Sequence, residues 1–170
     1  MEKNIKKIIV SKDGPYIVSG DIPLIKEVCD VDNEGEPGTY EKTEDYPRKD
    51  GYSLCRCGRS FNKPYCDGTH HKVGFDGTET ASREGYLDQS EKLSGPEIDL
   101  TDAPRLCSGG RFCHKGTWEH TENSDDPESK KIAIESACNC PSGRLVAWDK
   151  KTGEPIEETY DPTISILEYK

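Results

Sequence analysis

The sequence predicts a small, mainly β protein with short helices, a loop-rich α+β fold that metal clusters help to stabilise. Only 31% of the 170 residues are hydrophobic, with three Phe, two Trp and one Met, so the chain cannot build a large apolar core. Sixteen Gly and eleven Pro divide it into short elements. Eight cysteines could supply, through bound metal, the cross-links that a small core lacks.

The N-terminal part of the chain predicts a β-hairpin. Residues 7–10 and 16–19 are rich in β-branched side chains and flank the turn signal Asp13-Gly14. The following residues, 32–51, are polar and rich in Gly, Glu and Asp, and we expect a surface loop there. Residues 52–57 are expected to be extended again.

The most informative part of the chain is the run CRCGRSFNKPYCDGTH, which begins at Cys55. In an extended segment, side chains two residues apart point to the same side, so Cys55 and Cys57 can reach one metal ion. If Asp67 caps a helical turn, Cys66 and His70 lie on one face and can serve a second ion. Two protein ligands for each of two irons are what a [2Fe-2S] cluster requires.

This run resembles the CDGSH iron-sulfur family, which includes mitoNEET-like proteins. It fits the pattern C-x-C-x2-[ST]-x3-P-x-C-D-G-[SAT]-H, with Thr69 in place of the serine in the family's name. The resemblance implies a [2Fe-2S] cluster held by Cys55, Cys57, Cys66 and His70 on a mostly β scaffold. A structural zinc site is the alternative, because three Cys and one His also make a closed tetrahedral set. The C-x-C spacing, unlike the C-x2-C knuckles of zinc fingers, favours the cluster.

A histidine ligand changes the expected redox and acid chemistry of this site. Neutral His70 leaves the site one unit less negative than four cysteines would, which favours accepting an electron. We therefore expect a potential between four-cysteine ferredoxins and Rieske centres, which lie at about −150 to +300 mV. Protonation of the metal-facing nitrogen would remove a ligand, so we expect cluster loss or transfer in mild acid. Arg56, Arg59 and Lys63 either offset the negative charge of the cluster or are ordinary solvated side chains.

The second half of the chain predicts one helix and two strands. Residues 124–128, SDDPE, place a proline and acidic side chains where the first turn of a helix favours them. The helix should extend through Ala137 and stop at Pro141. Residues 145–149 and 163–167 are expected to be strands, with a turn at 151–153.

Four cysteines mark a second candidate centre. Cys107 and Cys113 form a C-x5-C loop, and Cys140 opens the stretch CPSGRL. This pattern resembles mono-cluster ferredoxins, in particular the divergent domain found beside CDGSH motifs. The resemblance implies a second cluster: Cys107, Cys113 and Cys140 fit [3Fe-4S], and adding Cys138 or His114 would permit [4Fe-4S]. A zinc site, a disulfide or plain buried thiols are the alternatives.

Composition restricts the partners and the compartment. The net charge of −10 argues against nucleic acid and suits a basic protein partner. The apolar run near the N-terminus is too short for a signal peptide or a membrane span, so we expect a cytoplasmic protein that is not bound to a membrane. In that compartment cysteines are metal ligands more often than disulfides, and lone Cys29 is expected to be a small buried hydrophobe.

These observations together predict an iron-sulfur protein with one cluster domain at 1–86 and another at 87–170. We expect one-electron transfer, cluster storage or cluster transfer, with a redox protein or an apo-protein acceptor as partner. We do not expect an enzyme, because the chain has no nucleophile-elbow, phosphate-cradling or dinucleotide motif. The alternatives are a zinc-stabilised interaction module and a redox subunit of a larger oxidoreductase. The resembled family includes homodimers, so a homodimer is a further expectation.

Overall fold

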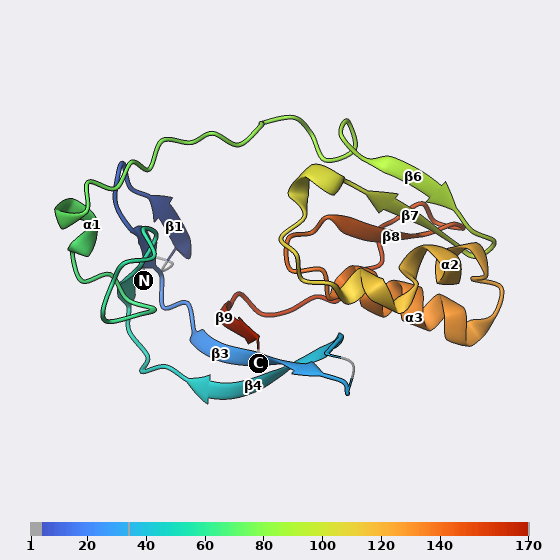
Figure 1. Ribbon diagram of the computed structural model, residues 1–170, viewed down its shortest axis with the longest axis horizontal. Helices are drawn as coiled ribbons and strands as arrows, with labels where there is room; N and C mark the ends of the chain where they lie inside the picture. The colour runs from blue at the N-terminus through green and yellow to red at the C-terminus, as the bar shows by residue number, and fades with distance from the viewer. Residues whose placement is uncertain (1–4, 34, 170) are drawn as a thin grey trace. The chain divides into compact units, whose positions relative to one another are not determined.

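The computed structural model describes residues 5–33 and 35–169, and it contains three small sheets of three strands each with a few short helices (Figure 1). This confirms the mainly β, small α+β class. The chain divides into two compact units. The first holds residues up to 28, 42–82 and 160–168, and the second holds 29–41, 83–159 and 169 onward.

The first unit is built on an antiparallel sheet in the order β1 (Lys7–Val10), β2 (Tyr16–Ser19), β5 (Gly51–Leu54). The predicted hairpin is confirmed, with Ile8 opposite Val18 and a left-handed Asp13 (φ 49°) in the turn. Val18 and Leu54 are buried and form the core of this unit with Ile22 and Leu24, which are also buried.

A second sheet has the strand order β4-β3-β9, formed by β3 (Leu24–Val31), β4 (Pro37–Asp45) and β9 (Ile164–Tyr169). The expected surface loop at 32–51 is therefore wrong over 37–45. Six of the nine residues of β4 are exposed, so its side chains have the composition of a loop. Pairing of its backbone with the backbone of β3 makes it a strand instead. The strand expected at 163–167 is confirmed by β9.

In the second unit, helices α2 (Thr117–Glu122) and α3 (Pro127–Cys138) pack on a sheet of order β6-β7-β8 (Figure 1). Its strands are β6 (Glu91–Ser94), β7 (Ile98–Asp102) and β8 (Leu145–Asp149), of which β8 was predicted. The predicted helix is confirmed as α3, where Ser129 N donates to the Asp126 carboxylate at 2.8 Å in an N-cap.

Three short helical segments carry predicted ligands or lie next to them. They are α1 (Thr69–Lys72) in the first unit, and η1 (Pro104–Leu106) and η2 (Phe112–Lys115) in the second. Among the helices of the described residues, none is long and apolar enough to cross a membrane.

Candidate metal centres

The four predicted ligands of the first centre form two close pairs. Cys55 Sγ lies 3.8 Å from Cys57 Sγ, and Cys66 Sγ lies 3.3 Å from His70 Nδ1. Two sulfurs bound tetrahedrally to one ion, each about 2.3 Å from it, would be about 3.8 Å apart. The first pair matches that separation, and the second pair is closer, as expected if a ring nitrogen were to bind the metal at a shorter distance than a sulfur.

Backbone pairing joins the two halves of the motif. Cys55 follows β5 directly, and its N–H donates to Pro64 O at 2.8 Å. Cys66 N donates to Ser53 O at 2.8 Å, so the two cysteines directly follow the two residues of one antiparallel bridge, Leu54 and Tyr65. The two pairs are brought together by this bridge, and each pair keeps the geometry of ligands to its own ion.

A short helix, α1, orients the histidine. Its N-cap is Gly68, with φ 84°, so the expectation that Asp67 caps it is wrong by one residue. Asp67 instead accepts hydrogen bonds from Phe61 N at 2.9 Å and Thr69 N at 3.0 Å, which lower its pKa to about 2. His70 is 8% exposed, with Nδ1 toward Cys66 and Nε2 beside Gly14. Nδ1 is therefore the nitrogen available to a metal.

Hydrogen-bond donors surround the sulfurs of this centre. Arg59 N donates to Cys57 Sγ at 3.4 Å, and Gly68 N donates to Cys66 Sγ at 3.5 Å. Burial raises the pKa of the Cys55 thiol, but hydrogen bonds from the Ser60 backbone and from Cys57 outweigh it, so the pKa is lowered overall. Metal-binding cysteines need this ionised form, so the donor set fits an iron-sulfur cluster.

Other residues singled out in the motif have structural roles. Arg56 donates to Ser11 O at 3.2 Å and to Gly77 O at 2.6 Å, so it ties the motif to its neighbours. Ser60 Oγ donates to Tyr65 O at 2.6 Å and closes a turn. Arg59 and Lys63 are exposed.

The second candidate centre is a cavity lined by three of the four predicted cysteines. Cys107 follows η1, Cys113 lies in η2 and Cys140 follows α3, and all three line the cavity together with Arg144. Cys138 is not among the lining residues, and its Sγ donates to Ile156 O at 3.4 Å. Three thiols from three different segments therefore converge here.

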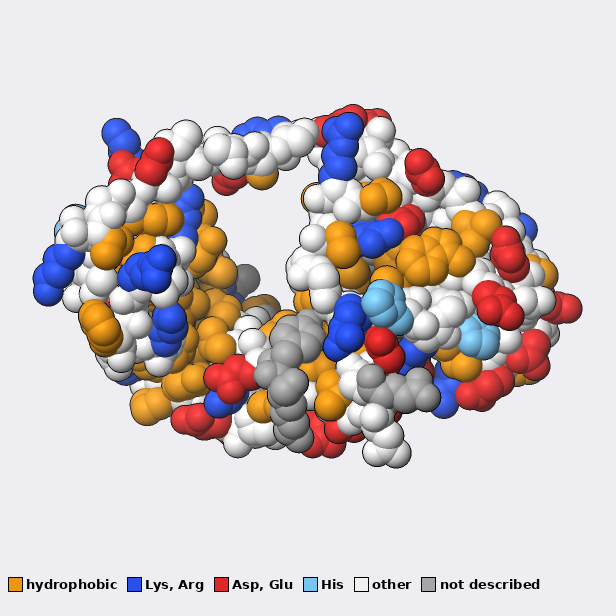
Figure 2. Space-filling model, in the orientation of Figure 1, with side chains coloured by type: hydrophobic (Ala, Val, Ile, Leu, Met, Phe, Trp, Pro, Cys, Tyr) orange, Lys and Arg blue, Asp and Glu red, His pale blue; other side chains and the backbone are white. Residues whose placement is uncertain are grey.

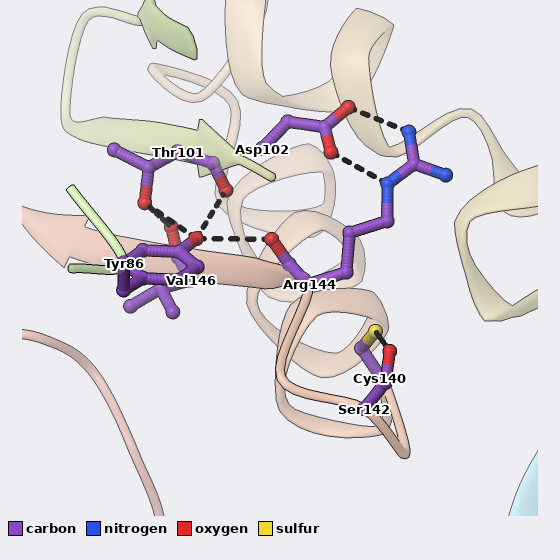
Figure 3. Close-up of polar contacts among 7 residues, drawn as sticks. All are labelled: Tyr86, Thr101, Asp102, Cys140, Ser142, Arg144 and Val146. Atoms are coloured by element: carbon purple, nitrogen blue, oxygen red, sulfur yellow. Dashed lines mark hydrogen bonds and ion pairs between the residues drawn. The ribbon is translucent and has the colours of Figure 1, made fainter. Parts of the chain in front are cut away.

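Sequence reasoning missed the cation of this cavity. Arg144 Nε and Nη2 donate to the two oxygens of Asp102 at 2.5 and 2.7 Å (Figure 3). The backbone N–H of Gly109 and then the Arg144 side chain lower the pKa of Cys107, whereas burial raises the pKa of Cys113. The guanidinium thus lies where it can offset the negative charge of a thiolate at Cys107. The sequence CPSGRL alone does not show that its arginine, Arg144, faces the cysteines.

His114, the other candidate for a fourth ligand, contacts a glutamate instead of the cysteines. Its Nδ1 lies 3.3 Å from Glu36 Oε2, and Arg111 Nη2 donates to Gly35 O at 2.7 Å. These contacts, with the Tyr40 and Phe112 rings 5.0 Å apart, hold residues 35–40 against the η2 segment.

All eight cysteines are free, and Cys29 is fully buried, as expected of a small hydrophobe. Within residues 5–33 and 35–169, no three Cys, His, Asp or Glu side chains are arranged as ligands of a single ion. What the described residues do present is a pair of ligand pairs at the first centre and a trio of thiols at the second.

Comparison with protein families supports both centres. Residues 13–71 match the family described as an iron-binding zinc finger of CDGSH type. Residues 93–150 match the family described as a divergent 4Fe-4S mono-cluster. No curated protein matches the chain. The two matches confirm the expected architecture and contain every predicted ligand of both centres.

Proposed function

Because the chain is an iron-sulfur protein that joins a CDGSH-type domain to a divergent 4Fe-4S mono-cluster domain, we propose that it carries single electrons between proteins. The observation that supports this best is the arrangement of Cys55 with Cys57 and of Cys66 with His70 as two ligand pairs. Paired ligands suit a [2Fe-2S] cluster, which when bound supplies a one-electron acceptor.

At the first centre, the protein would hold the oxidised and reduced states with little rearrangement. The N–H groups of Arg59 and Gly68 already point at ligand sulfurs, so they can stabilise added negative charge without moving. The three cysteine ligands are half-buried, which leaves the centre within reach of a docked partner. A neutral His70 keeps the ligand set one charge less negative than four thiolates.

At the second centre, we propose a cluster bound by Cys107, Cys113 and Cys140, without Cys138. Three thiolates suit [3Fe-4S], or [4Fe-4S] with a ligand other than cysteine at the fourth iron. Arg144 would reduce the electrostatic repulsion between these thiolates.

Cluster transfer to an apo-protein is a second candidate, and one contact favours it. His70 presents Nδ1 to the metal position, and a proton on this atom would compete with the metal. The proposed function therefore includes release of the first cluster in mild acid.

No organic substrate is proposed. We place the protein in the cytoplasm, which keeps thiols reduced, because its eight cysteines form no disulfide.

The test is anaerobic purification followed by parallel measurements on one sample. Iron, sulfide and zinc are quantified, and EPR spectra are recorded before and after photoreduction with deazaflavin. Stopped-flow absorption then measures how fast a reduced flavoprotein reduces the clusters. In a separate mixture, absorption measures the transfer of a cluster to apo-ferredoxin. Fast reduction with the clusters retained supports electron transfer. Reduction that is absent, or slower than cluster loss to apo-ferredoxin, contradicts it, and a colourless protein containing zinc selects the interaction module.

A further inference from the structure

The surface of the first centre differs in charge from the rest of the chain. Residues 46–75 hold six Lys and Arg against two Asp, a net charge of +4 within a chain of net charge −10. Between 55 and 75 the one carboxylate is Asp67, and its oxygens accept two backbone N–H groups. In Figure 2, Lys and Arg side chains gather beside hydrophobic ones on the body that contains α1. The charge of the whole chain favours a basic partner, whereas this local charge favours an acidic one.

The loop between Cys57 and Cys66 presents an aromatic ring to solvent. Phe61 is 93% exposed, and its neighbours Arg59 and Lys63, two residues away on either side, are exposed as well. None of the ion pairs of the described residues includes either basic side chain. A large aromatic side chain in this position contributes almost nothing to the core, and such residues are enriched where proteins bind one another.

Hydrogen bonds hold the backbone of this loop in one conformation. Phe61 N donates to Asp67 Oδ2 at 2.9 Å, and Asn62 N donates to Ser60 Oγ at 3.0 Å. Tyr65 N in turn donates to Asn62 O at 2.9 Å. A preorganised loop loses little conformational entropy when a partner docks on it.

We propose that Arg59, Phe61 and Lys63, which we call the docking loop, bind an acidic electron-transfer protein over the first centre. Phe61 enters an apolar depression on the partner, while the two cations face carboxylates around its rim. This inference rests on the proposed function. It adds the chemistry of the partner and the place where that partner binds, next to Cys57, whose sulfur the loop also contacts.

The experiment uses reduced flavodoxin, an acidic FMN protein, as the donor to the full-length, cluster-loaded chain. Stopped-flow absorption gives the second-order rate constant across a series of salt concentrations, and EPR of freeze-quenched samples identifies the centre that is reduced. The variants are Phe61→Ala and the double variant Arg59→Glu, Lys63→Glu. Matched controls in the second unit are Leu87→Ala, which also truncates an exposed apolar side chain, and Lys131→Glu with Lys151→Glu.

Each variant has a distinct expected result. The charge-reversed loop should react about tenfold or more slowly at low salt, and this difference should shrink as salt screens the charges. Phe61→Ala should react about five- to tenfold more slowly at every salt concentration, because an apolar contact is not screened. Both controls should stay within about twofold of the wild type. Thermal unfolding should be unchanged in Phe61→Ala, since its ring is exposed.

Photoreduced deazaflavin separates the failure of docking from the failure of the function. If deazaflavin reduces all variants equally while flavodoxin does not distinguish them, the docking proposal is overturned and electron transfer stands. A wild-type rate that rises with salt would also overturn it, because it would indicate a basic partner. Loss of a dimer in Phe61→Ala on sedimentation would assign the loop to a second copy instead. If deazaflavin reduces neither centre, the proposed function fails, and the docking proposal fails with it.

Discussion

Asp102→Asn and Arg144→Gln break the same ion pair, yet they should move the reduction potential of the second centre in opposite directions. Arg144 lines the cavity beside Cys107, and Asp102 binds its guanidinium with two hydrogen bonds (Figure 3). Removing the arginine leaves the site more negative and makes reduction harder. Removing the aspartate leaves the cation uncompensated and makes reduction easier.

The size of the effect follows from the position of Arg144 beside Cys107 in the cavity lining. Both residues line the cavity and the guanidinium lowers the pKa of Cys107, so its charge would lie roughly 6 Å from a metal bound by that sulfur. At an effective dielectric constant of about 20 to 40, a unit charge at that distance is worth about 1.4–2.8 kcal/mol. This corresponds to about 60–120 mV for one electron. We expect a decrease of this size in Arg144→Gln and a smaller increase in Asp102→Asn, whose carboxylate lies farther away.

The assay is a potentiometric titration of the second centre monitored by EPR. Lys92→Gln is the matched control, because it breaks a 2.7 Å ion pair with Asp99 in the same sheet, and neither residue lines the cavity. Both test variants should also lose stability toward urea. The loss should be less than the roughly 3–5 kcal/mol of a fully buried pair, since both side chains are partly exposed. Shifts of the same sign in both variants would refute the electrostatic account and indicate general disruption.

Three further predictions concern other parts of the molecule. His70→Cys should keep its [2Fe-2S] absorption to a lower pH than wild type, and release at the same pH would exclude the histidine as the acid trigger. Cys138→Ser should leave the second-centre EPR signal unchanged whereas Cys113→Ser abolishes it, and loss in both would make Cys138 a ligand. The cap to Ser129 N lowers the pKa of Asp126, so its stabilisation is complete above about pH 4 and lost as pH falls through the lowered value. Asp126→Ala should therefore lower the urea midpoint at pH 7, with an effect that shrinks as the pH falls below about 4, and an equal loss at every pH would contradict this.

Short-range signals made most of the local structure predictable. The hairpin at 7–10 and 16–19 follows from a turn signal between two apolar runs, and α3 follows from its proline and acidic first turn. β4 was not predictable, because its exposed side chains are polar and the pairing that makes it a strand comes from the backbone of β3. β6 and β7 were missed as well, although Ile98 and Leu100 alternate with polar residues as a strand requires.

The candidate ligands were predictable because metal chemistry restricts both residue type and spacing. The spacing of Cys55, Cys57, Cys66 and His70 indicates the pairs that the structure brings together. The choice among the later cysteines was not predictable. Cys138 and Cys140 are two residues apart, but the end of α3 separates them, so only Cys140 lines the cavity. Nor does sequence reveal that Arg144 faces the thiols, since β7 supplies the aspartate that holds it.

Anomalous diffraction from crystals of anaerobically purified protein, recorded on both sides of the iron and zinc absorption edges, tests the two-centre account most directly. We predict iron peaks at two separate places, one among Cys55, Cys57, Cys66 and His70, the other among Cys107, Cys113 and Cys140. A zinc peak at either place, or no iron peak beside His70 Nδ1, would contradict it.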